Sequence, residues 1–146
     1  MKNPHLLLLV AWLALWGILP TYKPSTAITN PLQGSRNVSA QSTTNVTVGN
    51  FDSRTCFTTE GASGEINFNL PTAAANLEYL FVGQAAQNLR VTASTGDTIR
   101  LYNLVTAAAG NVLAPAASAQ GSTLLLVCIN ATEWIGIYFA GPWTVT

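Results

Sequence analysis

Hydrophobic and polar residues alternate one by one in a series of short stretches of this chain, a pattern typical of β-strands. The stretch INFNL at 66–70 shows it most clearly, because its apolar side chains occupy every second position and asparagines lie between them. Pro71 ends the stretch, since proline has no backbone N–H to donate to a neighbouring strand. A second apolar run occupies residues 77–82. We therefore expect two strands here, joined by a turn of small residues.

Similar stretches recur about every ten residues, a spacing that favours a sandwich or barrel and leaves no room for crossover helices. The further predicted strands are 46–48, 54–59, 87–94, 98–102, 121–129, 133–139 and 143–145, with a loop and one short strand around Val112 between them. We expect an all-β domain over residues 45–146, a small antiparallel β-sandwich or barrel of about eight short strands. Residues 124–129 are apolar at odd and even positions alike, which predicts a strand that is central or packed against another subunit.

Two segments precede this domain. Residues 1–27 contain an apolar run at 6–19, and its fourteen residues in a helix would rise only about 21 Å, short of the roughly 30 Å hydrocarbon core of a membrane. The segment is therefore typical of a signal peptide cleaved after Ala27. The alternative is an N-terminal apolar helix, retained as a membrane anchor through 6–19 or buried between subunits. Residues 28–44 are polar and lack periodicity, which predicts an extended linker or arm.

The composition narrows the classes of function. Hydrophobic residues make up 49% of the chain and charged residues only 8%, against about 25% in an ordinary soluble domain. The surface must therefore be built from uncharged polar residues, which suits a protein covered by other copies of itself or one that lives outside the cell. Six basic and six acidic residues give a formal net charge of zero, so we expect no nucleic-acid partner.

The two cysteines, Cys56 and Cys128, are too few for a closed zinc site. In an exported protein they could form a disulfide, which would close a loop of about 70 residues and add about 4 kcal/mol of stability in the chain-entropy model. The alternative is a pair of buried thiols that act as small hydrophobic groups.

No group of residues predicts a catalytic centre. The only histidine, His5, lies within residues 1–27, so triads and metal sites that need histidine are not expected in the domain. The acids that could form a pair of catalytic carboxylates are Glu60, Glu65, Glu78 and Asp97. Because they are scattered near turns, we interpret them as turn and surface residues, and we expect neither a cofactor nor an enzyme.

Some aromatic and basic residues are candidates for binding. The aromatic candidates for a surface that recognises a glycan or protein are Tyr79, Tyr102, Trp134 and Trp143. Aromatic residues at strand spacing are more often part of the core, so both interpretations stay open. Arg90 and Arg100 come close if their strands pair as a hairpin, and the alternative is a surface salt bridge with Glu78.

Several short motifs follow one another in a definite order. They are GASG at 61–64, LP at 70–71, AAA at 73–75, LEYLFV at 77–82, AAQNLRV at 85–91, GDTI at 96–99, NATEW at 130–134 and GPWT at 141–144. In this order and spacing, residues 46–146 resemble a small β domain of tailed-phage virion proteins, of the tail-fibre-like or head-surface type.

The resemblance implies a non-enzymatic structural module on a virion, which assembles as a homo-oligomer such as a trimer or with other virion proteins. The alternative is a secreted or membrane-anchored cell-surface domain that binds a glycan or a protein. The localisation expected is then the virion or the extracellular space.

Overall fold

The structure is a computed structural model that describes residues 36–146. The predicted signal peptide or apolar helix at 1–27, and the first part of the predicted arm, lie outside the described residues. Among residues 36–146, no helix has both the length and the apolar character needed to cross a bilayer.

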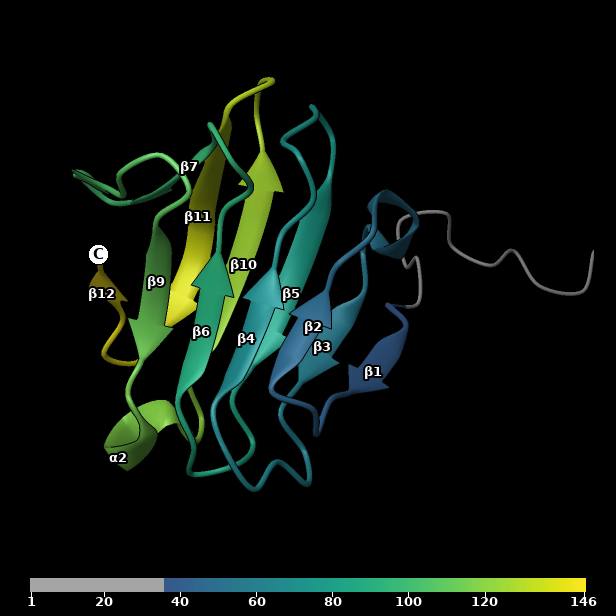
Figure 1. The fold of residues 1–146 in the computed structure, drawn as a ribbon, viewed down its shortest axis with the longest axis vertical. Coiled ribbons are helices and arrows are strands. Elements are labelled where there is room, and N and C mark those ends of the chain that lie inside the picture. The colour runs from purple at the N-terminus through teal and green to yellow at the C-terminus, as the bar shows by residue number, and fades with distance from the viewer. Residues whose placement is uncertain (1–35) are drawn as a thin grey trace, which may run out of the picture. The chain divides into compact units, whose positions relative to one another are not determined.

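Twelve strands in the described part of the chain form two sheets that face each other (Figure 1). The seven-stranded sheet contains, in spatial order, β1 (Val38–Ala40), β3 (Cys56–Thr58), β5 (Glu78–Val82), β10 (Thr123–Cys128), β11 (Glu133–Ala140), β7 (Thr98–Leu101) and β8 (Leu104–Val105). The five-stranded sheet contains β12 (Thr144–Val145), β9 (Asn111–Ala114), β6 (Leu89–Thr92), β4 (Ile66–Asn69) and β2 (Asn45–Thr47). Two short helices, η1 (Asn50–Asp52) and α2 (Ala116–Ala119), lie in the connections.

The first six strands alternate between the two sheets. β1, β3 and β5 are parallel neighbours in one sheet, and β2, β4 and β6 are parallel neighbours in the other. The chain thus winds through three coils, each with one strand per sheet, as in a short β-solenoid. The mostly-β architecture is confirmed, but the prediction of antiparallel sheets is wrong, since five of the ten pairings within residues 36–146 are parallel. No helix is needed between parallel neighbours, because a strand of the opposite sheet makes the crossover.

The later strands close the sandwich mainly with antiparallel pairs, although β11 and β7 are parallel. β10 lies between β5 and β11, and β9 lies between β6 and β12, each antiparallel to both neighbours. Two strands were not expected from the sequence. β8 has only two residues, and β1 lies in the segment predicted as an arm, where it pairs with β3. The described part of that segment, residues 36–44, therefore belongs to the β domain.

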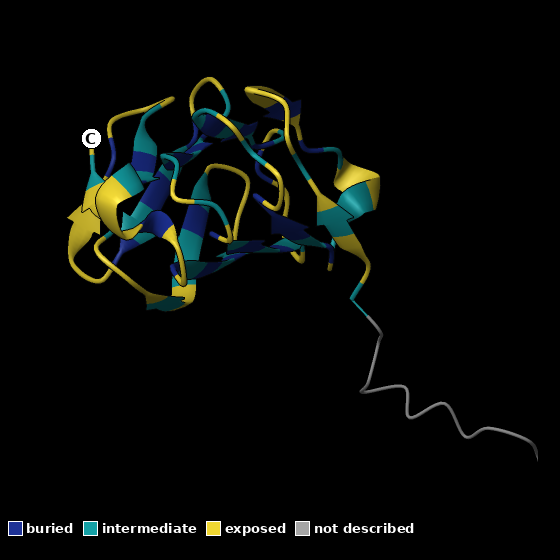
Figure 2. Ribbon diagram, turned by 90° about the horizontal axis from the view of Figure 1, so that it is seen from below, coloured by how far each residue is buried: buried dark blue, intermediate teal, exposed yellow. Residues whose placement is uncertain are grey.

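The core lies between the two sheets, where each strand contributes every second side chain. One row of directly opposed inward residues crosses the five-stranded sheet: Val46, Phe68, Val91, Val112 and Val145. A matching row in the seven-stranded sheet contains Phe57, Phe81, Leu124 and Phe139. The ring centres of Phe57 and Phe68 are 5.4 Å apart and those of Phe68 and Phe81 are 5.0 Å apart, so aromatic contacts join the sheets. Figure 2 shows these buried layers surrounded by exposed loops.

Gly83 fixes the end of β5 against the loop that contains α2. Its N–H donates to the Ser122 carbonyl over 2.8 Å, and its own carbonyl accepts from the N–H of Gly121 over 2.8 Å. A Cβ at Gly83 would lie 2.0 Å from the carbonyl oxygen of Ala119, a backbone atom that cannot turn away. Only a glycine allows this close approach.

We expect Gly83→Ala to lower the free energy of unfolding by about 1–3 kcal/mol, the usual range for an overpacked site. Gly64→Ala is the matched control, because no heavy atom lies within 4 Å of its Cβ position. Urea unfolding of both variants measures the difference. Equal stability of the two variants would contradict the packing described for Gly83.

Candidate functional site

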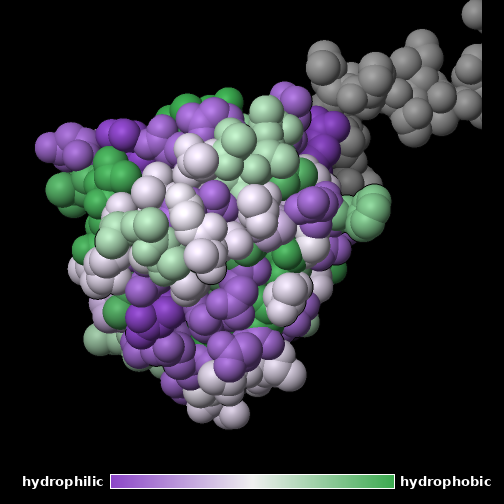
Figure 3. Space-filling view, turned by 45° about the horizontal axis from the view of Figure 1, so that its top comes forward, coloured by the Kyte–Doolittle hydropathy of each residue, from purple (hydrophilic) through white to green (hydrophobic). Residues whose placement is uncertain are grey.

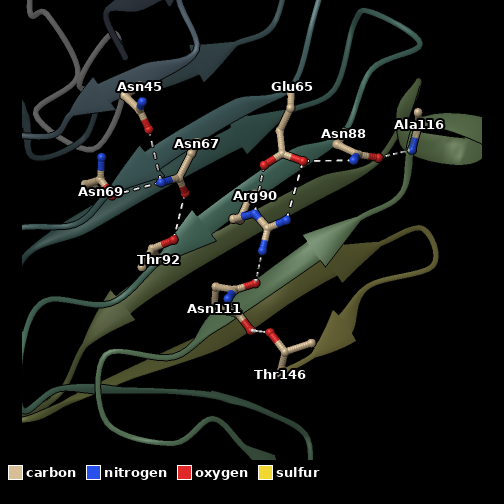
Figure 4. A network of polar contacts seen from close by, with 10 residues as sticks. All are labelled: Asn45, Glu65, Asn67, Asn69, Asn88, Arg90, Thr92, Asn111, Ala116 and Thr146. Atoms are coloured by element: carbon tan, nitrogen blue, oxygen red, sulfur yellow. Dashed lines mark hydrogen bonds and ion pairs between the residues drawn. The ribbon is translucent and has the colours of Figure 1, made fainter.

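The outer face of the five-stranded sheet is polar and its side chains bond to one another (Figure 4). Arg90, on β6, donates from Nε to Oε1 of Glu65 over 3.0 Å and from Nη1 to Oδ1 of Asn111, on β9, over 3.1 Å. Asn88 donates to Oε2 of Glu65 over 2.8 Å. The hydrogen bonds from Arg90 and then Asn88 hold the pKa of Glu65 below its ordinary value.

A second group on this face is centred on Asn67, on β4. Its amide nitrogen donates to Oδ1 of Asn69 over 2.9 Å and to Oδ1 of Asn45 over 3.5 Å. Its amide oxygen accepts from the hydroxyl of Thr92 over 2.7 Å. Figure 3 shows hydrophilic residues gathered in the lower half of the view, over this sheet. Because these groups satisfy one another, this face has little demand for a partner.

The middle of the outer face of the seven-stranded sheet is apolar, whereas Thr58, Thr123 and charged residues occupy outward positions around it. Its central row of directly opposed outward residues runs across five strands and contains Val38, Cys56, Leu80, Leu125 and Tyr138. Beside this row, Val82, Val127 and Ile135 also point outward, at half-buried positions of β5, β10 and β11. Strands that face water on one side normally place polar residues there. This face, which we call the apolar face, is the candidate functional site.

A β-bulge increases the apolar area on β11. Tyr138 lies opposite Leu125 and Gly136 lies opposite Leu126, so Ile137 is an extra residue on β11. As a result, the consecutive residues Ile137 and Tyr138 are both exposed, at 60% and 62%. Bulges redirect side chains in this way where a strand has a special role.

The charged residues on the outward positions of this sheet are already paired. Glu78, on β5, forms an ion pair with Arg36. Arg100, on β7, donates from Nε to Oε1 of Glu133, on β11, over 2.7 Å. These pairs lie at partly exposed positions and are worth little in stability, but they leave the apolar face without net charge.

Two of the four aromatic residues predicted for a binding surface are in the core. Tyr79 and Trp134 are fully buried, and their ring centres are 5.5 Å apart. The surface interpretation is wrong for both and the core interpretation is confirmed, because each has the same inward orientation as the core residues of its strand. Tyr102 is 79% exposed and packs edge-on against Phe139, whose ring centre is 4.4 Å away. Trp143 is half-buried, and its indole N–H donates to the Thr123 carbonyl over 2.9 Å.

The structure does not bring the two cysteines together. Cys56 and Cys128 are free thiols. Cys56 is outward on β3, beside inward Phe57, whereas Cys128 is buried on β10 and donates to the Asn130 carbonyl over 3.0 Å. The thiols thus lie on opposite faces of one sheet, and this arrangement does not support the hypothesised disulfide. Burial raises the pKa of both thiols.

The acids and arginines singled out from the sequence do not gather at one site, and only Glu65 and Arg90 among them form an ion pair. Glu60 is exposed on a turn, and Asp97 is buried, where it accepts a 2.7 Å hydrogen bond from the N–H of Ala73. Arg90 and Arg100 lie in different sheets, so the hairpin hypothesis for them is wrong. Within residues 36–146, no group of three or more potential metal ligands is present.

Sequence reasoning found only part of the apolar face. The doubly apolar pattern at 124–129 pointed to Leu125 and Val127, but Ile135, Ile137 and Leu80 were missed. The run IGIY at 135–138 could have indicated the two isoleucines, because it has apolar residues at both odd and even positions of one strand, so both faces of that strand are apolar. A scan against models of protein families finds no match, and neither does a search of curated proteins.

Both cysteines should react with an alkylating reagent when the protein is denatured without reductant. Intact-mass spectrometry is expected to show two added groups per chain, because the two thiols lie on opposite sides of the seven-stranded sheet. A reduced and denatured sample provides the reference for complete labelling. A chain that gains no group until reductant is added would contradict the placement of the cysteines.

Alkaline pH should destabilise the fold through Tyr79. Its hydroxyl donates to the Gly49 carbonyl over 2.9 Å, and burial, followed by the charge of Asp52, raises its pKa to about 12 from an ordinary value of 10.0. The folded state therefore favours the neutral phenol. This contribution to stability is fully present below about pH 10 and is lost as the pH rises through about 12.

Urea unfolding of the wild type at several pH values between 9 and 12 is expected to show a free energy of unfolding that falls once the pH exceeds the ordinary tyrosine pKa of about 10. In Tyr79→Phe, the free energy of unfolding should fall less steeply with pH, because the variant has no hydroxyl to ionise at this position. The variant is also expected to be less stable at neutral pH. Parallel pH profiles for the wild type and the variant would contradict the assignment.

Proposed function

We propose that this chain is a non-enzymatic structural module that acts by assembling into a larger particle, in the manner of a small β domain on a phage virion. The observation that carries the proposal is the apolar face, where a row of uncharged residues crosses five strands on the side away from the core. Monomeric soluble proteins rarely expose large contiguous apolar patches, and such patches mark sites of association.

The composition supports the same proposal. The centres of protein interfaces are depleted in charged residues and enriched in aromatic ones. The chain has only 8% charged residues, and the exposed Tyr138 lies at one end of the central row of the apolar face, next to Ile137. The hydrogen-bonded polar face of the other sheet suits solvent. In this proposal the apolar face serves association, and the polar face of the five-stranded sheet keeps the particle soluble.

The apolar run at residues 6–19 favours a second candidate function. A secreted or membrane-anchored cell-surface domain would need such a segment for export, and it could use the apolar face to bind a protein ligand. In that function the domain would be present as single copies that meet their ligand outside the cell.

The oligomeric state of the full chain distinguishes the two candidates. Light scattering coupled to size exclusion is expected to give one mass, a multiple of the single chain, that stays constant across a wide range of protein concentration. Intact mass defines the N-terminus of the sample, so that the mass of one copy is known. A monomer at every concentration would contradict the proposal, and a monomer that is exported and cleaved after Ala27 would favour the second candidate.

A further inference from the structure

We infer that the apolar face is covered in solution by the same face of a second copy of this chain, packed sheet on sheet. This inference rests on the proposed function and specifies the surface and the partner. It commits to one occupant because the composition, the charge and the size of the face all fit a second copy.

The composition fits because the face is complementary to itself. Its central row offers aliphatic side chains, one thiol and one phenol, and it contains no charged residue. In a two-fold interface the same patch meets itself, so the side chains of one copy must suit those of the other. An apolar row meets this condition without any further feature, and sheets pack face to face at about 10 Å through such side chains.

The charge fits because the charged residues around the face are already paired, so the face does not attract a partner of opposite charge. The ion pairs of Arg36 with Glu78 and of Arg100 with Glu133 are made within one chain. A nucleic acid or an anionic membrane would require an excess of basic residues here, which the face does not have. A second copy brings the same balanced pairs and therefore no repulsion.

The size of the face fits a small interface. The face spans five adjacent strands, from β1 to β11, and at about 4.8 Å between strands and about 3.4 Å per residue for about five residues it covers roughly 400 Å² per copy. Two copies would bury roughly 800 Å², the size of a small and weak interface. The bulge on β11 adds Ile137 as a further projecting side chain.

The test places charge on the two most exposed positions of the apolar face. The double variant Ile137→Lys, Tyr138→Lys should fold, because both side chains are more than half exposed. Thr47→Lys is the matched control, since Thr47 is exposed on the polar face of the other sheet. Tyr138→Ser is a milder second variant, should the double variant not fold. Light scattering of each full chain gives the mass, and circular dichroism verifies the strand content.

Cys56 reports independently whether the face is covered, because it lies in the central row and is a free thiol. Under native conditions a maleimide is expected to label Cys56 several-fold more slowly in the wild type than in the double variant. The buried Cys128 serves as the internal reference in both proteins.

The inference expects a dimer, or a higher even number of copies, for the wild type and Thr47→Lys, and one copy for the double variant. An oligomer that survives in the double variant, or an odd number of copies such as a trimer, would overturn the inference and leave the proposed function standing. A monomeric wild type would overturn both. If Cys56 were still protected in that monomer, residues 1–35 of the same chain would be the cover.

Discussion

The structure depends on one constraint, which is that neither sheet can form without the other. Within the three coils, each strand from β1 to β4 is hydrogen bonded to the strand two places later in the chain, and the strand between them lies in the opposite sheet. The aromatic contacts of Phe57, Phe68 and Phe81 hold the two sheets together across the core. Pairing within a sheet and packing between sheets are therefore formed together, and we expect them to be lost together.

Only the inward-facing side chains of each strand take part in the packing between the sheets. The outward-facing side chains can therefore differ between the two sheets. Asn67 and Arg90 lie in hydrogen-bonded groups on the five-stranded sheet, whereas Leu80 and Leu125 lie in an apolar row on the seven-stranded sheet. A protein that functions as a monomer gains nothing from an apolar outer row. The division between the two faces is thus the feature that supports the proposed association.

Most of the strands could be predicted from the sequence, but their partners could not. The alternation of apolar and polar residues at 66–70 would be the same in a parallel and in an antiparallel strand. The pattern therefore does not show which strands pair or that the chain winds between two sheets. The core positions of Tyr79 and Trp134 follow from the parity of their neighbours, which the aromatic character of the two residues obscured. Cys128 lies in a run that is apolar at both parities, so the face to which it points could not be derived.

The central claim is that the apolar face is covered in the native protein although it lies outside the core. The most direct measurement is the effect of a soluble paramagnetic agent on methyl signals in nuclear magnetic resonance. Leu113, half-buried on the outer side of β9, is the reference for an open face, and Leu126 is the reference for the core. The account predicts that the methyl groups of Leu125 and Ile135 are shielded like those of Leu126. Broadening as strong as that of Leu113 would contradict it.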